Sequence, residues 1–338
     1  MAENLLEVNN LKTYFFTRGG VVKAVDDVSF VMKPGQTLGV VGESGCGKSV
    51  TALSVMRLIA TPPGKIVGGE ITFNGEDILD KNLSELTALR GSKISMIFQD
   101  PMTSLHPFYK VGFQIAEAIR THQSVSKREA HDQAVEMLRR VGIPKPEERA
   151  NQYPHEFSGG MRQRAMIAMA LSLNPDILIA DEPTTALDVT VQAQILDLID
   201  RLKAEFNAAV VMITHDLGVV AEHCDEIQVM YAGKIVEVGD RRDIYYGSHH
   251  PYTWGLLGSI SRLDSSTKER LQPIKGLPPS LILVPPGCAF HPRCPYAFDR
   301  CKVEVPKLIP IDGHHASACH LSLADRERIF HEEVMARR

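Results

Sequence analysis

Short apolar runs alternate with amphipathic segments along the first 240 residues of the chain. Leu38–Val41 and Ile177–Ala180 consist almost entirely of apolar residues, which is typical of strands buried on both faces. Val189–Phe206 instead repeats its apolar residues at the spacing of one helix face. Strands that alternate with helices predict an α/β fold with a mainly parallel sheet.

Three parts of the chain depart from this alternation. The first stretch carries only short strand patterns (Leu5–Leu11, Val21–Val25 and Val28–Val31), and we expect an antiparallel β subdomain there. Residues 101–173 show helical periodicity alone and predict an inserted helical subdomain. After about residue 240, Pro, Gly, His and Cys become dense. We therefore expect one domain over residues 1–240 and a small Cys-rich domain over 241–338.

Composition limits the possible partners. The 338 residues have a net charge of −4, which does not favour nucleic acid as a partner. No apolar run reaches the roughly 18 residues of a transmembrane helix. Met1–Leu11 lacks the basic and apolar regions of a signal peptide. If the protein acts at a membrane, a partner must supply the membrane-spanning part.

A glycine-rich loop follows the Leu38–Val41 strand and precedes a helical pattern over Lys48–Ile59. Its spacing, G-x-x-x-x-G-K-[ST], in a strand–loop–helix context predicts a P-loop, whose backbone N–H groups surround phosphate oxygens. Lys48 can neutralise the β- and γ-phosphates, and Ser49 can bind Mg²⁺. The predicted nucleotide-binding residues are Gly42, Glu43, Ser44, Gly45, Cys46, Gly47, Lys48, Ser49 and Val50.

Two further motifs point to phosphate chemistry. Asp181 and Glu182 end the apolar Ile177–Ala180 strand, where Asp181 can hold Mg²⁺ and Glu182 can act as the general base for an attacking water. Ser158-Gly159-Gly160 opens a helical pattern and can present backbone N–H groups to a second phosphate. Taken alone, this last motif favours an N-cap with a flexible glycine pair.

These motifs, in this order, resemble the nucleotide-binding subunits of ABC transporters, over roughly the first 240 residues. The resemblance implies a P-loop NTPase (RecA-like) core. It assigns Gln99 as a ligand of Mg²⁺ and the attacking water, and His215 as a contact of the γ-phosphate and Glu182. Ala186-Leu187-Asp188 resembles the family's dimer-contact loop. Either Tyr14 or Phe15 stacks on adenine, and Phe15 is nearer the family's register.

In this family two ATPase domains pack head to tail around two ATP molecules. The resemblance therefore implies that Ser158, Gly159 and Gly160 contact the ATP of a partner subunit. Here Phe157 and Met161 flank this motif, where the family usually has Leu and Gln. That departure bears on the partner's ATP site, because the one containing Lys48 is built from other residues.

The segments Gln99–Pro107, Asp181–Val191 and His250–Thr253 resemble peptide-importer ATPases, as does the Cys-rich block over residues 287–319. This subfamily implies a second homologous ATPase subunit, two transmembrane permease subunits and an extracytoplasmic peptide-binding protein. It also implies a peripheral position on the cytoplasmic face of the inner membrane. Dipeptides are the expected cargo, and glutathione or nickel importers remain alternatives.

Cys288, Cys294, Cys301 and Cys319 follow the spacing C-x5-C-x6-C-x17-C. Four thiolates can hold a [4Fe–4S] cluster or a zinc ion. The spacing matches neither a zinc ribbon nor a ferredoxin, but some members of the resembled subfamily carry a [4Fe–4S] cluster here. We expect the cluster, with zinc or reduced thiols as alternatives. A mixed zinc site could draw on nearby histidines, which are His291, His314, His315 and His320.

Two other function classes compete with the transporter ATPase. Soluble ABC ATPases that bind nucleic acid or ribosomes usually carry two ATPase halves, whereas this chain has one P-loop and no basic tail. A regulatory iron–sulfur protein with a vestigial ATPase would not need Lys48, Asp181 and Glu182 together. The sequence therefore favours an importer ATPase that uses ATP and Mg²⁺.

Overall fold

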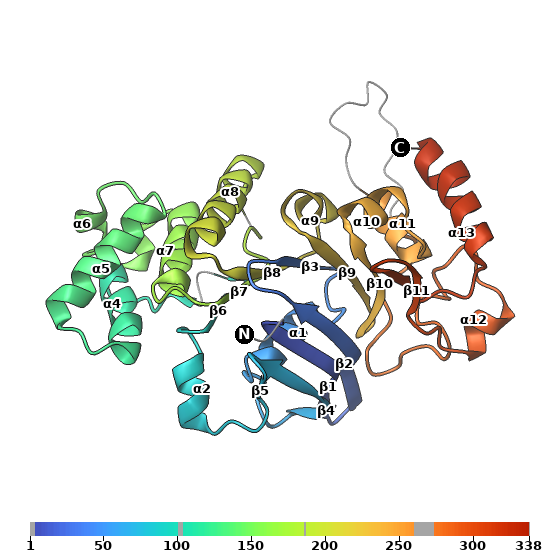
Figure 1. Cartoon of the computed structure of the whole chain (residues 1–338), viewed down its shortest axis with the longest axis horizontal. Helices are drawn as coiled ribbons and strands as arrows, with labels where there is room; N and C mark the ends of the chain where they lie inside the picture. Colours follow the sequence, from blue (N-terminus) through green and yellow to red (C-terminus); the bar gives the residue numbers. More distant parts are fainter. Residues whose placement is uncertain (1–3, 101–103, 186, 260–273, 338) are drawn as a thin grey trace. The chain divides into compact units, whose positions relative to one another are not determined.

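The computed structural model describes residues 4–100, 104–185, 187–259 and 274–337 (Figure 1). Within these residues the chain forms two compact units. The first unit contains residues up to 32, residues 37–79 and residues from 214 onward, and the second contains residues 33–36 and 80–213. The two units are described separately below. The domain boundary predicted near residue 240 stays a prediction.

An antiparallel sheet opens the first unit. In it β1 (Leu6–Thr17) lies between β2 (Gly20–Met32) and β4 (Gly64–Phe73), and β5 (Glu76–Asp77) pairs with β4. The prediction of two strands over residues 21–31 was wrong, because they form one strand. Asp27 lies at a bulge with φ 73°, where Asn10 Nδ2 donates a hydrogen bond to its carboxylate at 2.9 Å.

Mixed pairing joins the other strands of this unit. The buried strand β3 (Thr37–Val41) runs parallel to β9 (Glu226–Tyr231). A turn with positive φ at Ala232 and Gly233 connects β9 to β10 (Lys234–Asp240), and the two strands form an antiparallel hairpin. β12 (His315–Ser317) pairs with β10, and β11 (Ile309–Asp312) pairs with β12. The Cys-rich segment therefore adds strands to the sheet that contains β3.

The helices of the first unit are mostly short. The helix predicted over Lys48–Ile59 ends at Val55, and Arg57 just beyond it has a left-handed backbone with φ 50°. A capping box between Asp240 and Asp243 starts α10. The helices are α1 (Lys48–Val55), α9 (Leu217–His223), α10 (Arg241–Tyr246), α11 (Pro251–Leu257), α12 (Asp299–Val303) and α13 (Leu323–Ile329), followed by turns at Phe330–Val334 and Met335–Arg337.

The second unit contains three parallel strands and a group of helices (Figure 1). In it β6 (Ile94–Ile97) pairs with β7 (Ile177–Asp181), and β7 pairs with β8 (Ala209–Thr214), whose last residue is assigned to the first unit. The helices α4 to α7 fall within the block predicted to be helical, whose exact limits stay a prediction. The helices are α2 (Leu83–Leu89), α4 (Val111–His122), α5 (Lys127–Arg140), α6 (Pro146–Arg149), the 3-10 turn Pro154–Glu156, α7 (Gly159–Leu171) and α8 (Val189–Phe206).

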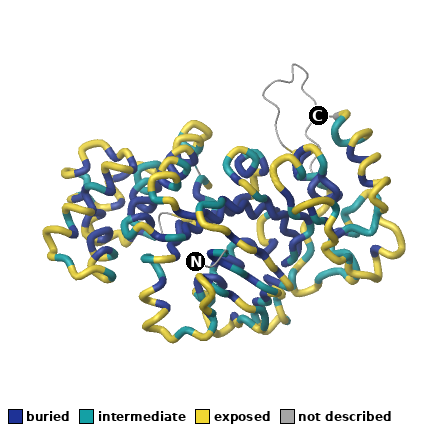
Figure 2. The backbone as a smooth tube through the Cα atoms, in the orientation of Figure 1, coloured by how far each residue is buried: buried dark blue, intermediate teal, exposed yellow. Residues whose placement is uncertain are grey.

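Burial explains why these strands form the core. Every residue of β3, β7 and β8 is buried, which agrees with their mainly apolar sequences (Figure 2). α8 has the bounds predicted for it and buries one stripe that includes Ile195, Leu198 and Ile199. In the part of the chain that the structure describes, no helix is long and apolar enough to cross a membrane. The protein is an α/β protein with mixed sheets.

Candidate functional site

The glycine-rich loop joins β3 to α1. Gly47 precedes the helix with φ 113°, a backbone conformation that glycine adopts without strain. A Cβ on Gly47 would lie 2.1 Å from the Ala24 carbonyl oxygen, and one on Gly42 would lie 2.2 Å from that of Met230. A Cβ on Gly45 would meet nothing within 4 Å. The loop is therefore held tightly at both ends and open at Gly45, where an anion could approach its backbone.

Lys48 is the buried cation of this loop, with a relative exposure of 4%. Its Nζ donates hydrogen bonds to the carbonyl oxygens of Gly42 at 2.7 Å and Glu43 at 3.1 Å. Burial raises the pKa of the neighbouring Cys46 thiol, although Lys48 opposes this effect. Cys46 therefore stays a neutral, buried thiol under the loop. Ser44 and Gly45 are exposed, whereas Ser49 and Val50 are half-buried at the start of α1.

Both aromatic candidates for adenine stacking lie on β1 and are half-buried. The Tyr14 hydroxyl donates a hydrogen bond to Asp26 at 2.7 Å, and the Lys23 ammonium lies 5.7 Å from the centre of its ring. Burial and the Asp26 carboxylate raise the pKa of Tyr14 to about 12. These contacts give Tyr14 a structural role within the antiparallel sheet. Phe15 lies opposite Val22 and Gly64 in the two neighbouring strands.

The acidic pair ends β7 in the second unit. Asp181 is 4% exposed, and Glu182 follows it with φ 46°, a left-handed conformation that is uncommon outside glycine. Gln99 Nε2 donates a hydrogen bond to Glu182 Oε2 at 3.0 Å, and the Thr185 hydroxyl donates to the same oxygen at 2.8 Å. The structure thus brings Gln99 and Glu182 together and fixes the direction of the carboxylate. Such positioning suits a general base.

Thr185 is a contact that the sequence analysis missed. The signal was local, because residues i and i+3 of a turn lie close together. Here the Thr185 N–H donates to the Glu182 carbonyl oxygen at 3.2 Å, while its hydroxyl reaches the carboxylate.

His215 lies on the exposed turn after β8. Asp216 stabilises this turn, because it accepts the Gly218 N–H at 2.7 Å and donates its own N–H to the Thr214 hydroxyl at 3.1 Å. His215 belongs to the first unit and Glu182 to the second, so their expected contact stays a prediction.

Ser158 and the two glycines after it start α7. The Ser158 hydroxyl accepts the Met161 N–H at 3.3 Å, which makes Ser158 an N-cap. Ser158 and Gly159 are exposed, so the N-terminus of α7 is accessible, and the binding of a phosphate there stays a prediction. Phe157 is instead buried, with 3% exposure.

The dimer-contact loop and the segment after Gln99 are described only in part. Asp188 caps α8 by accepting the Val191 N–H at 3.0 Å. Ala186 and residues 101–103 lie outside the described residues.

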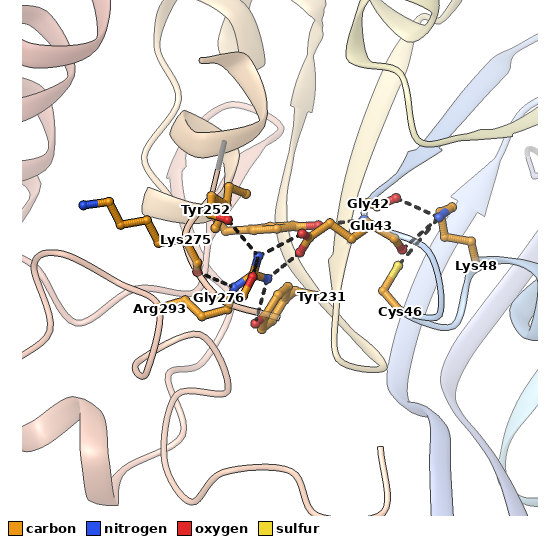
Figure 3. A network of polar contacts seen from close by, with 10 residues as sticks. Gly42, Glu43, Cys46, Lys48, Tyr231, Tyr252, Lys275, Gly276 and Arg293 are labelled. Atoms are coloured by element: carbon orange, nitrogen blue, oxygen red, sulfur yellow. Dashed lines mark hydrogen bonds and ion pairs between the residues drawn. The ribbon is translucent and has the colours of Figure 1, made fainter. Parts of the chain in front are cut away.

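Glu43 makes contacts that the sequence analysis did not foresee. Its carboxylate pairs with Arg293, and its N–H donates to the Tyr252 hydroxyl at 2.7 Å (Figure 3). The motifs around residues 252 and 293 were noticed as subfamily markers. Their contact with a loop more than 200 residues away depends on the tertiary fold.

The four C-terminal cysteines affect one another electrostatically. Burial raises the pKa of Cys288 to about 11 and that of Cys294 to about 12, and the nearby Cys301 and Cys319 thiols contribute to both increases. The Cys288 N–H also donates to the Cys301 carbonyl oxygen at 2.9 Å. Yet the described residues contain no group of three or more His, Cys, Asp or Glu that could hold a metal ion.

Three of the four histidines considered for a mixed zinc site have other partners. One ring nitrogen of His291 lies 2.9 Å from the Cys288 carbonyl oxygen, and one of His320 lies 2.8 Å from that of Glu304. His315 is buried against the Glu237 carboxylate at 3.1 Å. These contacts do not favour a mixed Cys/His zinc site.

Comparisons with known proteins agree with this geometry. Residues 25–185 match the family described as ABC transporter, and residues 236–301 match the one described as oligopeptide/dipeptide transporter, C-terminal region. The oligopeptide transport ATP-binding protein OppD of Salmonella typhimurium is 55% identical, over 94% of each chain. The dipeptide transport ATP-binding protein DppD of Bacillus subtilis is 52% identical, over 92% of this chain and 93% of its own. The dimeric structure of a bacterial ABC transporter cassette aligns with a TM-score of 0.63 and 28% identity, over 70% of this chain and 99% of its own.

Proposed function

Because this chain belongs to the family of ABC transporter ATP-binding proteins, we propose that it is the ATP-hydrolysing subunit that powers import of peptides. Residues 236–301 match the C-terminal region of oligopeptide and dipeptide transporters, and this match is the main support for peptides as the cargo. Relatives named for oligopeptide and for dipeptide transport are similarly close to this chain, at 55% and 52% identity. We therefore propose peptides as the cargo, with dipeptides as the first to test.

We propose that the glycine-rich loop binds the phosphates of ATP. Its support is the opening at Gly45 and the buried ammonium of Lys48 at the mouth of the loop. On binding, the ammonium would exchange its two carbonyl acceptors for phosphate oxygens. Ser49 would contribute its hydroxyl to Mg²⁺. Phe15 is the proposed adenine contact, since the Tyr14 hydroxyl is already bonded to Asp26.

For hydrolysis we propose Glu182 as the general base. Its support is the pair of hydrogen bonds from Gln99 and Thr185, which fix the position of one carboxylate oxygen. Asp181 and Gln99 are proposed to hold Mg²⁺, and His215 is proposed to contact the γ-phosphate. The chain would act mainly by positioning these groups and by balancing the developing charge.

We also propose that Ser158, Gly159 and Gly160 bind the ATP of a second, homologous ATPase subunit. The exposed N-terminus of α7 supports this role. The similar cassette structures described as dimeric, one of them bound to ADP and Pi, support the pairing of two cassettes. Each such dimer would hold two composite sites.

The permease subunits need a docking surface, and we propose the aromatic patch that precedes and begins α4. Phe108, Tyr109 and Phe113 are 81%, 50% and 48% exposed, and the rings of Tyr109 and Phe113 stack with centres 5.3 Å apart. Next to them is a hollow of about 340 Å³ lined in part by His106 and Met169. Exposed aromatic rings beside a hollow are typical of protein-binding sites. We place the subunit on the cytoplasmic face of the membrane, with a peptide-binding protein on the other side.

For the Cys-rich segment we propose a [4Fe–4S] cluster bound by Cys288, Cys294, Cys301 and Cys319. Its support is the donor set of four thiols, which influence one another's pKa. When bound, the cluster would cross-link the segment and could exchange one electron. Iron and sulfide analysis of the anaerobically purified chain and of Cys294→Ser tests this. About four irons per chain, lost in the variant, are expected, whereas zinc without iron would contradict the proposal.

The transport function is tested in proteoliposomes that contain the complete transporter and its binding protein. Labelled dipeptides, longer peptides, glutathione and nickel are offered separately, with ATP on the side of this subunit. We expect ATP-dependent accumulation of peptides, and none with Glu182→Gln in the same assembly. Uptake of glutathione or nickel without uptake of peptides would refute the proposed cargo while leaving the ATPase assignment intact.

A further inference from the structure

A salt bridge joins the Cys-rich segment to the glycine-rich loop (Figure 3). Arg293 Nη1 lies 2.5 Å from Glu43 Oε2, and Nη2 lies 2.9 Å from Oε1. The two side chains therefore meet through two parallel hydrogen bonds between opposite charges, the strongest geometry available to such a pair. The arginine side chain is 5% exposed and the glutamate 25%, so solvent screens the pair far less than a surface ion pair.

Hydrogen bonds and aromatic rings hold the Arg293 side chain in place. Its Nε donates to the Lys275 carbonyl oxygen at 3.1 Å, and Nη2 donates to that of Gly276 at 3.2 Å. Its guanidinium lies 5.9 Å from the ring centre of Tyr231 and 6.0 Å from that of Phe290. A cation held by carbonyl groups and aromatic faces cannot follow a moving carboxylate. Arg293 therefore sets the position of Glu43.

Glu43 transmits this constraint to the loop through its backbone. Its N–H donates to the hydroxyl of Tyr252, a fully buried side chain. Its carbonyl oxygen accepts a hydrogen bond from Lys48 Nζ at 3.1 Å. One residue of the loop is thus bonded by its side chain to Arg293, by its amide to α11 and by its carbonyl group to the phosphate-binding lysine.

We propose that Arg293 is a positioning residue for ATP binding. Through Glu43 it holds the glycine-rich loop and Lys48 in the arrangement that receives the phosphates. The proposal makes the ATPase site depend on the segment around residue 293, which is distant from the site in sequence. It concerns ATP affinity alone and does not rest on the identity of the transported solute.

The chain offers a matched control for the test. Arg300 also forms a bidentate pair, with Glu304 at 2.6 and 2.7 Å, and it also precedes a cysteine of the same segment. Both members of that pair are more than half exposed. Arg300→Ala therefore removes the same chemistry from the same segment without touching the glycine-rich loop.

The test compares Arg293→Ala, Arg293→Lys, Glu43→Ala, the double variant Arg293→Ala/Glu43→Ala and Arg300→Ala in the full-length chain. Affinity for MgATP is measured by displacement of a fluorescent nucleotide, and KM and kcat by phosphate release from the assembled transporter. Thermal unfolding confirms that each variant is folded at the assay temperature. Hydrogen bonds to charged groups typically change an equilibrium by roughly 10- to 100-fold, so we expect Arg293→Ala, which removes two of them, to weaken ATP binding and raise KM by a factor in this range.

A positioning role predicts a specific pattern among the variants. KM should rise more than kcat falls. Arg293→Lys should keep part of the affinity for ATP, because lysine supplies the positive charge but not the two parallel N–H donors of the guanidinium. The double variant should bind ATP no more weakly than the single variant with the lower affinity, because both changes break the same contact. Arg300→Ala should bind ATP as the wild type does. A folded Arg293→Ala chain with wild-type affinity and KM would overturn the proposal, as would equal losses in Arg293→Ala and Arg300→Ala.

Discussion

Replacing Glu182 with glutamine separates the chemistry of the site from its geometry. The amide has nearly the same shape as the carboxylate, and its oxygen can still accept hydrogen bonds from Gln99 and Thr185. The left-handed turn at position 182 costs a glutamine about as much as a glutamate. We therefore expect the free energy of unfolding to change by no more than about 0.5 kcal/mol, and ATP binding to be retained.

The catalytic loss should be far larger than the structural one. A positioned general base contributes roughly 10²- to 10⁴-fold, equivalent to about 3–5 kcal/mol in the activation barrier. Phosphate release by the assembled transporter, measured at saturating MgATP, should fall by this factor. Thr185→Val keeps the carboxylate but removes one of its two hydrogen bonds, so we expect it to lose roughly tenfold. If Glu182→Gln in every complex hydrolyses ATP as fast as wild type, the assignment of Glu182 as general base is refuted.

Two further predictions concern residues of the first unit. Phe15→Ala should weaken ATP binding by about 1–3 kcal/mol, the usual contribution of stacking on a base. Tyr14→Phe should bind ATP normally in the same fluorescence titration. Weaker binding by Tyr14→Phe and normal binding by Phe15→Ala would instead assign the adenine contact to Tyr14. Burial lowers the pKa of His249 to about 4 and of His250 to about 3, so both histidines stay neutral in the fold but take up protons when unfolded below about pH 6.5. The free energy of unfolding should therefore fall between pH 6.5 and 4 by about 1.4 kcal/mol per pH unit for each histidine. Urea titrations followed by the fluorescence of Trp254, the single tryptophan, measure this free energy. A free energy of unfolding that does not change over this pH range would contradict the prediction.

Some of the fold followed from local pattern. Apolar runs predicted most of β3 and β7, because a strand buried on both faces carries mainly apolar side chains. The bounds of α8 followed from its periodicity, and the structure adds that the Asp188 side chain caps the helix. The bulge at Asp27 was read as a break between strands, because two adjacent acids are uncommon inside a strand. The pairing of β12 with β10 joins residues about 80 positions apart and left no local signal.

The sequence by itself determined the chemistry of this protein. The spacing of Gly42, Gly47 and Lys48 is set by the size of a phosphate group, so it can be recognised without coordinates. Tertiary structure alone decided what holds these residues in place. The contact of Arg293 with Glu43 spans 250 positions, and that of Gln99 with Glu182 spans 83. Such pairs depend on how distant segments pack, and a single chain carries no local pattern for a contact that only the folded core creates.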